Sequence, residues 1–299
     1  MGIALYALGM FFMSTMDVSA KWLSGDYPVV QVVFLASLFA LLPALLVLRN
    51  EGARTLLSPK WMYLILRSVI ATGTIFFFFF ALKHLPLAEV AAIFAVAPLL
   101  MTAMAALLLR EDVGLRRWMA TMLGLLGATI IIRPGSLAFD PASLLALGSA
   151  FCYALAMILS KMMVRIESNA AIMFYNYVTV NIISGAMLLF TWTMPNGKDT
   201  LIFVSMGIFG GCANYFCISA CRSSPIQALA PFDYTALIWA ILFGYLFWQH
   251  VPDLWTWVGA VAVTMGGIYV LSGNASPNND REAMSPHTDQ LAQPRRQKE

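Results

Sequence analysis

Ten continuous apolar segments follow one another along the chain, separated by short breaks at charged residues or at proline and glycine. Their apolar runs do not alternate with polar positions, so they predict helices rather than the strands of a membrane barrel. A helix needs about 20 mostly apolar residues to cross a bilayer, and most of the segments approach that length. The expected spans are residues 2–22, 29–48, 61–82, 87–109, 117–133, 142–163, 169–193, 200–221, 226–248 and 255–272.

The composition indicates a chain whose surface faces lipid. It is 60% hydrophobic and 11% charged, with a mean hydropathy of +0.77, whereas a soluble domain carries about 25% charged residues. Ten spans use about 200 residues, which leaves short loops and a polar stretch, 273–299, that lacks apolar periodicity. We expect that stretch to be a disordered tail. No room is left for a separate soluble catalytic domain.

Lysine and arginine are unevenly distributed between the two sets of loops. The even-numbered loops hold nine and the tail holds four more, against four in the odd-numbered loops. The positive-inside rule therefore predicts that both termini and the tail lie in the cytoplasm and that the chain is a multi-pass protein of the cell inner membrane. The first segment has no basic leader and no small-residue cleavage site, so we expect a span rather than a signal peptide.

The chain is similar to itself at an offset of 139 residues. ALKHLPLAEVA (81–91) aligns with ACRSSPIQALA (220–230), which places Pro86 on Pro225. At this offset, or one residue from it, further matching pairs are Trp118 and Trp257, Gly127 and Gly266, and Lys21 and Lys161. The register of spans and loops is kept without a gap over half of the chain.

This offset divides the chain into two units, 1–135 and 136–272, of five spans each. Because five is odd, the two units must cross the membrane in opposite directions. We therefore predict an all-α integral membrane protein with ten transmembrane helices in an inverted 5+5 structural repeat. Inverted repeats around a site at the membrane midplane are typical of carriers that work by alternating access.

The pattern of spans, the prolines Pro86 and Pro225, and LLLREDVGLRRWMATMLGLLGATIIIRPG (107–135) resemble the drug/metabolite transporter superfamily, EamA type. Each half of that family commonly ends its fourth span with a glutamate. Glu111 fits this pattern, whereas His250 stands where the second glutamate is expected. The resemblance implies secondary active transport of a small organic metabolite, through a central cavity lined by both halves. Amino acids and their derivatives, riboflavin-like vitamins and S-adenosylmethionine are among the substrates it implies.

Charged side chains inside apolar spans cost about 2.5–3.5 kcal/mol each, so each needs a reason. Asp233 lies about eight residues into the ninth span, two residues after Pro231, whose ring loosens the helix. We expect Asp233 to couple a proton or to anchor a cationic substrate; the alternative is a structural ion pair with Arg67. Arg67 itself is a candidate for binding a substrate carboxylate or phosphate, or else it extends to the cytoplasmic interface.

Three other charged residues are candidates for coupling or gating, together with Pro231. Asp17 and Lys21 are one helical turn apart, which favours an intrahelical ion pair. Glu89 follows Pro86 at the start of the fourth span, where an acidic side chain is favoured by the helix dipole.

Polar and aromatic residues in the later spans could form a pocket that stacks on a solute and hydrogen-bonds it. The same residue types also hold membrane helices together, so both interpretations stay open. These candidates are Asn214, Tyr215, Tyr234, Trp239, Asn176, Tyr175 and Tyr177.

No cofactor, metal or nucleic acid is expected. The four cysteines lie in apolar segments without the histidines or carboxylates of a metal site. The expected partners are a small organic solute, the lipid bilayer and a coupling proton. A monomer and a homodimer are both compatible with the sequence. The rival interpretations are a membrane-embedded enzyme and an ion channel.

Overall fold

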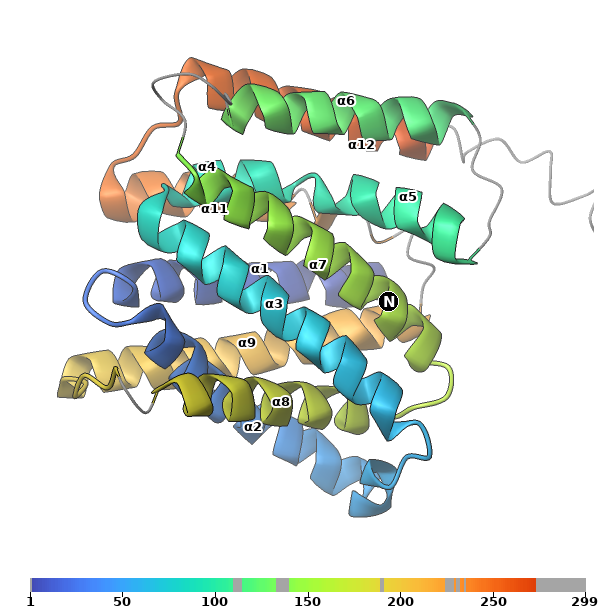
Figure 1. Ribbon diagram of the computed structural model, residues 1–299, viewed down its shortest axis with the longest axis vertical. Coiled ribbons are helices and arrows are strands. Elements are labelled where there is room, and N and C mark those ends of the chain that lie inside the picture. Colours follow the sequence, from blue (N-terminus) through green and yellow to red (C-terminus); the bar gives the residue numbers. More distant parts are fainter. Residues whose placement is uncertain are drawn as a thin grey trace, which may run out of the picture.

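The computed structural model describes residues 2–109, 115–132, 140–188, 191–223, 229, 232–233 and 235–272. These residues form helices and loops and contain no strand. The helices, shown in Figure 1, are α1 (Gly2–Leu23), α2 (Val29–Glu51), the short η1 (Ala53–Leu56), α3 (Trp61–His84), α4 (Leu87–Phe94), α5 (Ala97–Leu109), α6 (Leu115–Ile132), α7 (Ala142–Met163), α8 (Asn169–Leu188), α9 (Gly197–Ser223), α11 (Thr235–Trp248) and α12 (Leu254–Ser272).

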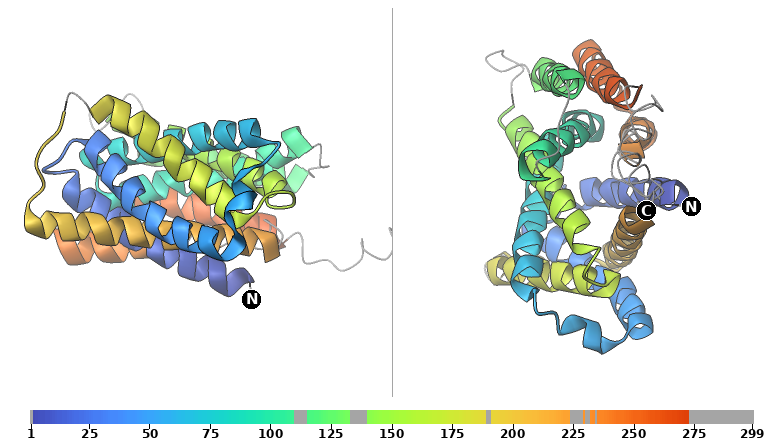
Figure 2. Two further views of the ribbon diagram at one scale, coloured as in Figure 1. Left: turned by 90° about the horizontal axis from the view of Figure 1, so that it is seen from below. Right: turned by 90° about the vertical axis from the view of Figure 1, so that its right-hand side faces the viewer.

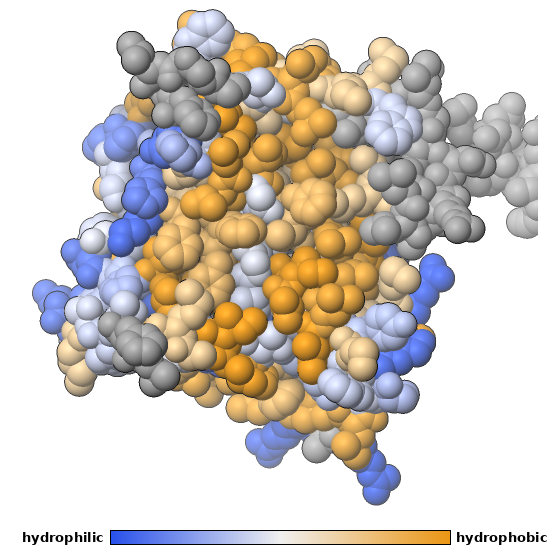
Figure 3. All heavy atoms as spheres, in the orientation of Figure 1, coloured by the Kyte–Doolittle hydropathy of each residue, from blue (hydrophilic) through white to orange (hydrophobic). Residues whose placement is uncertain are grey.

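Six of these helices, α1, α2, α3, α7, α8 and α9, are long and apolar enough to cross a bilayer. The remaining apolar helices are shorter. On the face shown in Figure 3, hydrophobic residues form a broad band, and hydrophilic residues gather toward the ends of the helices. A band of this kind lets the lipid chains contact apolar side chains while the polar ends reach water.

The expected span 87–109 is not one helix. α4 ends at Phe94 and α5 begins at Ala97, with a turn between them. Pro98 accounts for the break, because it has no N–H to donate and its ring would clash with the Phe94 carbonyl in a continuous helix. The seventh expected span also ends early, since α8 ends at Leu188 and residues 191–196 are not helical.

Small residues let the helices approach closely. A Cβ added at Gly207 of α9 would clash with the Phe39 Cβ and lie 2.6 Å from the Ala36 carbonyl oxygen of α2. At Gly211, one turn later, it would lie 3.0 Å from the Ala40 carbonyl oxygen. This is the packing that a pair of glycines four residues apart allows in membrane helices.

Figures 1 and 2 show α6 and α12 side by side at one edge of the bundle. A Cβ at Gly127 of α6 would lie 2.8 Å from the Gly259 carbonyl oxygen of α12, so the two backbones nearly touch. The end-on view in Figure 2 shows the other helices arranged in a ring beside this pair.

Two loops at one end of the bundle are joined by hydrogen bonds. The Gln31 amide donates to the Thr193 carbonyl at 2.6 Å, and the Thr193 N–H donates back to the Gln31 side chain at 2.9 Å. The Tyr27 hydroxyl donates to the Asp199 carboxylate at 2.6 Å, and this bond raises the pKa of Tyr27 above its ordinary value. These contacts fix the α8–α9 loop and the start of α9 against the α1–α2 loop and the start of α2.

Candidate functional site

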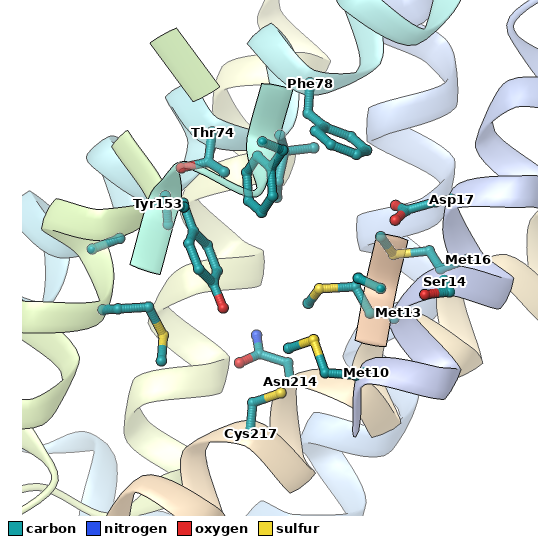
Figure 4. A pocket seen from close by; sticks show the side chains of 18 of the residues that line it. Met10, Met13, Ser14, Met16, Asp17, Thr74, Phe78, Tyr153, Asn214 and Cys217 are labelled. Carbon is teal, nitrogen blue, oxygen red and sulfur yellow. The ribbon is translucent and has the colours of Figure 1, made fainter. Parts of the chain in front are cut away.

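A cavity of about 200 Å³ lies at the centre of the bundle. Residues from α1, α2, α3, α4, α5, α7, α8, α9 and α11 line it, as does Asp233. Apolar side chains, chiefly of alanine, methionine and phenylalanine, form most of its wall, and a few polar groups interrupt them. Figure 4 shows side chains of α1, including Met10, Met13 and Asp17, facing Tyr153 and Phe78 across the open space.

The break between α4 and α5 borders this cavity. Phe94 and Ala95 at the end of α4, and Ala97 and Pro98 at the start of α5, all line it. Interrupted helices are tolerated at membrane depth where they line a cavity or are buried in protein. The proline that breaks the helix therefore also shapes the candidate site.

Arg67 of α3 is buried, with 6% of its surface exposed, and lines the cavity. Its Nε donates to the Ser160 hydroxyl at 2.9 Å, and its Nη1 donates to the Asn176 side-chain oxygen at 2.8 Å. Within the described ranges, no carboxylate pairs with it and Nη2 has no acceptor. Two neutral acceptors thus orient the guanidinium without neutralising it, and the side chain is buried between α3, α7 and α8.

Asp233, just before α11, also lines the cavity. Its Oδ1 accepts a hydrogen bond of 2.6 Å from the Tyr6 hydroxyl of α1, which lies 3.4 Å from the Tyr153 hydroxyl of α7. Its Oδ2 is buried and has no hydrogen-bond partner among the described residues. The ion pair with Arg67 considered from the sequence is not formed, since each residue has other partners.

Asp17 and Lys21 do not form the expected intrahelical ion pair. Lys21 instead donates to the Leu82 carbonyl at 2.5 Å and the Leu85 carbonyl at 2.7 Å, at the end of α3. In the part of the chain that the structure describes, no hydrogen bond or ion pair reaches the Asp17 carboxylate, which lines the cavity. The physical reason is that the exposed carbonyls of a helix end are ready acceptors for a lysine.

The remaining polar candidates are divided between the cavity and its surroundings. Asn214 and Asn176 line the cavity, and Asn214 donates to the Tyr177 hydroxyl at 3.2 Å. Tyr175 donates to the Leu56 carbonyl at 3.0 Å and does not line the cavity. Tyr215 and Trp239 do not line it either; Tyr215 packs edge-on against Phe216, and Trp239 against Phe11.

Glu89 lies half-buried in the first turn of α4, away from the cavity wall. Tyr234, Pro231 and Glu111 lie outside the described residues. His250 follows α11, and its backbone N–H donates to the Gly244 carbonyl at 3.2 Å. The described part of the chain holds no group of three histidine, cysteine, aspartate or glutamate side chains that could bind a metal.

Sequence reasoning missed the neutral residues that hold the charged ones. Tyr6, Tyr153 and Ser160 lie in apolar spans where a single hydroxyl gives no signal of its own. Ser14 was also missed, although it precedes Asp17 by three residues and so shares its helix face.

Comparison with known proteins adds an independent line of evidence. A family model described as "EamA-like transporter family" matches residues 1–133 and, separately, residues 140–272. A riboflavin transporter of Brucella anthropi is 27% identical over 266 residues, covering 86% of this chain and 94% of the relative. An S-adenosylmethionine uptake transporter of Rickettsia felis is 23% identical over 270 residues, covering 90% of this chain and 92% of the relative.

The fold is also shared with a solved structure. A crystal structure covers 92% of this chain and 99% of its own chain with a TM-score of 0.68, at 20% sequence identity. This likeness concerns the fold alone.

Proposed function

Because the chain belongs to the EamA-like transporter family, we propose that it is a secondary active permease that moves a small organic metabolite across the inner membrane by alternating access. The observation that carries this proposal is the central cavity, whose wall comes from both family-matched halves and contains charged side chains that form no ion pair with any described residue. Charged side chains inside a membrane bundle are costly and mark the pathways of solutes or ions.

The proposal includes ten spans in an inverted 5+5 repeat, with residues 1–135 and 136–272 as the two units. Positions 139 residues apart line the cavity together: Arg67 with Met206, Ile75 with Asn214, and Phe94 with Asp233. A substrate site at the interface between two repeats is lined by equivalent positions of both repeats, as these pairs are. The two members of each pair differ in chemistry, which gives a bound solute one preferred orientation.

Two lysine contacts support the same repeat. Lys21 donates to the Leu82 carbonyl, and Lys161 donates to the Cys221 carbonyl at 2.9 Å. Leu82 and Cys221 are 139 residues apart, and the two lysines are 140 apart. The same contact thus joins the first helix of each half to the end of the third.

Within this scheme, Arg67, Asn176 and Asn214 bind the solute, and Asp233 takes up the coupling proton. Asp233 suits this role because Tyr6 holds one carboxylate oxygen, while the other is buried and bonds to none of the described residues. The proposed substrates are an amino acid or its derivative, a riboflavin-like vitamin, or S-adenosylmethionine. Riboflavin and S-adenosylmethionine appear in the names of the relatives described above. The proposed orientation places both termini in the cytoplasm; a homodimer is compatible with it.

Solute counterflow in proteoliposomes tests this function. Vesicles loaded with an unlabelled solute are diluted into a trace of the same solute carrying a label, with riboflavin and S-adenosylmethionine as the first probes. A carrier accumulates the label transiently without a net driving force. An ion channel only equilibrates the label, and a membrane enzyme changes it chemically, so either result would contradict the proposal.

A further inference from the structure

Two polar side chains on one face of α1 have no partner in the part of the chain that the structure describes. Asp17 lines the cavity without a hydrogen bond or ion pair. Ser14, one turn earlier, also lines the cavity, is 3% exposed, and has a hydroxyl that makes no hydrogen bond. Figure 4 shows both on the α1 side, with the Asp17 carboxylate directed into the open space.

The Ser14 hydroxyl is unusual for its helix. Hydroxyl side chains in membrane helices commonly donate to the carbonyl four residues earlier. Thr15 does so to Phe11 at 2.9 Å, Ser19 to Thr15 at 3.1 Å, and Ser24 to Ala20 at 2.6 Å. A buried hydroxyl left unpaired costs free energy, so the absence of a partner at Ser14 points to a group that arrives with the solute.

Arg67 provides the opposite charge at another level of the same cavity. Lys21 contacts Leu82, which sets α1 and α3 in register. Counting down from that contact at about 1.5 Å per residue places Arg67 about 22 Å and Asp17 about 6 Å below it, so their backbones lie roughly 16 Å apart along the bundle. Asp17 therefore does not neutralise Arg67, and each charge faces the cavity separately.

Asp233 differs from Asp17 in its surroundings. Its Oδ1 accepts a hydrogen bond from Tyr6, whereas no hydrogen bond from a described residue reaches the Asp17 carboxylate. The two carboxylates of the cavity thus have different surroundings, and different surroundings are how one site gives two carboxylates two roles.

We propose that Ser14 and Asp17 form the subsite for the cationic group of an amphoteric solute whose anionic group binds Arg67. This inference rests on the proposed transport function and names the substrate class for it. Between the two charged ends, the thioethers of Met10 and Met13 and the Phe78 ring provide a polarisable wall that suits an apolar or aromatic body. Asp17 is then a substrate-binding residue rather than part of a gate.

The test compares probes that differ only in charge, by thermal stabilisation of the purified full chain. One series is S-adenosylmethionine with its decarboxylated form; another is 8-aminooctanoate, whose two charges lie at opposite ends of an apolar chain, with octylamine and octanoate; riboflavin is the uncharged probe. We expect at least one ampholyte to stabilise the wild type more than its singly charged analogues. Asp17→Asn weakens binding of that ampholyte by roughly tenfold or more, since a charge-assisted contact is lost. Ser14→Ala weakens it by a smaller factor.

These changes in affinity depend on the charge of the probe, so they distinguish a loss of binding from a loss of folding. Asp17→Asn does not change the affinity for the analogue that lacks the cationic group, and Arg67→Gln does not change it for the analogue that lacks the anion. Asp26→Asn removes a carboxylate from an exposed loop, and Ser19→Ala removes a hydroxyl that bonds its own helix; both retain wild-type affinity. If Asp17→Asn is not monodisperse, Asp17→Glu replaces it and retains the preference for ampholytes.

Three results would each overturn the inference. The first is that no ampholyte stabilises the protein, and the second is that riboflavin stabilises it best. The third is that Asp17→Asn weakens the binding of all probes equally. If the protein catalysed counterflow of riboflavin, the proposed permease function would be supported, but the proposal of an amphoteric substrate would be contradicted. The two proposals can therefore be tested separately.

Discussion

Arg67 and Asp233, two charged residues of the cavity, are each held by neutral side chains. Arg67 is oriented by Ser160 and Asn176, and Asp233 by Tyr6, so neither is cancelled by an ion pair with the other. The sequence could single out Arg67, Asp17 and Asp233, because a charge in an apolar span needs a reason. It could not identify Tyr6 or Ser160, because these contacts join residues far apart in the chain and depend on tertiary packing.

At the scale of single residues, the Asp233→Asn substitution separates proton coupling from solute binding. Asparagine keeps the size of the side chain and can still pair with Tyr6, but it cannot take up a proton. We expect counterflow of the transported solute to stay within about threefold of the wild type, while accumulation driven by a pH gradient falls to background. Both assays use the same proteoliposomes, with Asp26→Asn as the control. Gradient-driven accumulation that persists in Asp233→Asn would remove Asp233 from the coupling step.

At the scale of elements, the longest segments were the most predictable. The lengths of α1, α2, α3 and α7 agree with the expected spans to within a few residues, because apolar length alone decides them. The break between α4 and α5 was not predicted, although Pro98 was visible. A proline in an apolar run can either kink a helix or end it, and only the surrounding packing decides which.

Pro98→Ala tests whether this break serves transport. Alanine is about 3 kcal/mol more favourable than proline inside a helix, so the substitution favours a continuous α4–α5 helix. We expect a higher melting temperature together with a counterflow rate of roughly a tenth of the wild type or less, because the interrupted helix borders the cavity. A protein that is stabilised and transports normally would show that the break has no role in the cycle.

Gly207→Ala tests the close approach of α9 to α2. The new methyl group would lie 2.6 Å from the Ala36 carbonyl oxygen, so the backbones must separate. Overpacking of this kind costs about 1–3 kcal/mol and lowers the melting temperature by roughly 3–10 °C. The matched control is Gly244→Ala in α11, where an added Cβ meets nothing within 4 Å. Equal melting temperatures for the two variants would contradict the packing argument.

At the scale of the whole molecule, the proposed repeat explains why the cavity is central. The family model matches the two halves separately, and positions 139 residues apart line the same space. The offset was visible in the sequence because prolines, tryptophans and glycines keep their spacing. The chemistry of the cavity was only partly visible, because Tyr175, Tyr215 and Trp239 proved to pack outside it. An amphipathic side chain in a membrane helix fits a pocket and a helix interface equally well, so its sequence position does not distinguish them.

The most direct test of this account is access to the cavity from both sides of the membrane. Thr74 lines the cavity near the middle of α3, so Thr74→Cys is introduced after the four native cysteines are replaced by serine. Val69→Cys, on the exposed face of the same helix, is the control.

A membrane-impermeant maleimide is applied to right-side-out and to inside-out vesicles of each variant. The account predicts that Thr74→Cys is labelled from both sides, more slowly when a saturating solute is present, and that Val69→Cys is not labelled from either side. Labelling of Thr74→Cys from one side only, under every ligand and gradient condition, would contradict alternating access and with it the proposed carrier.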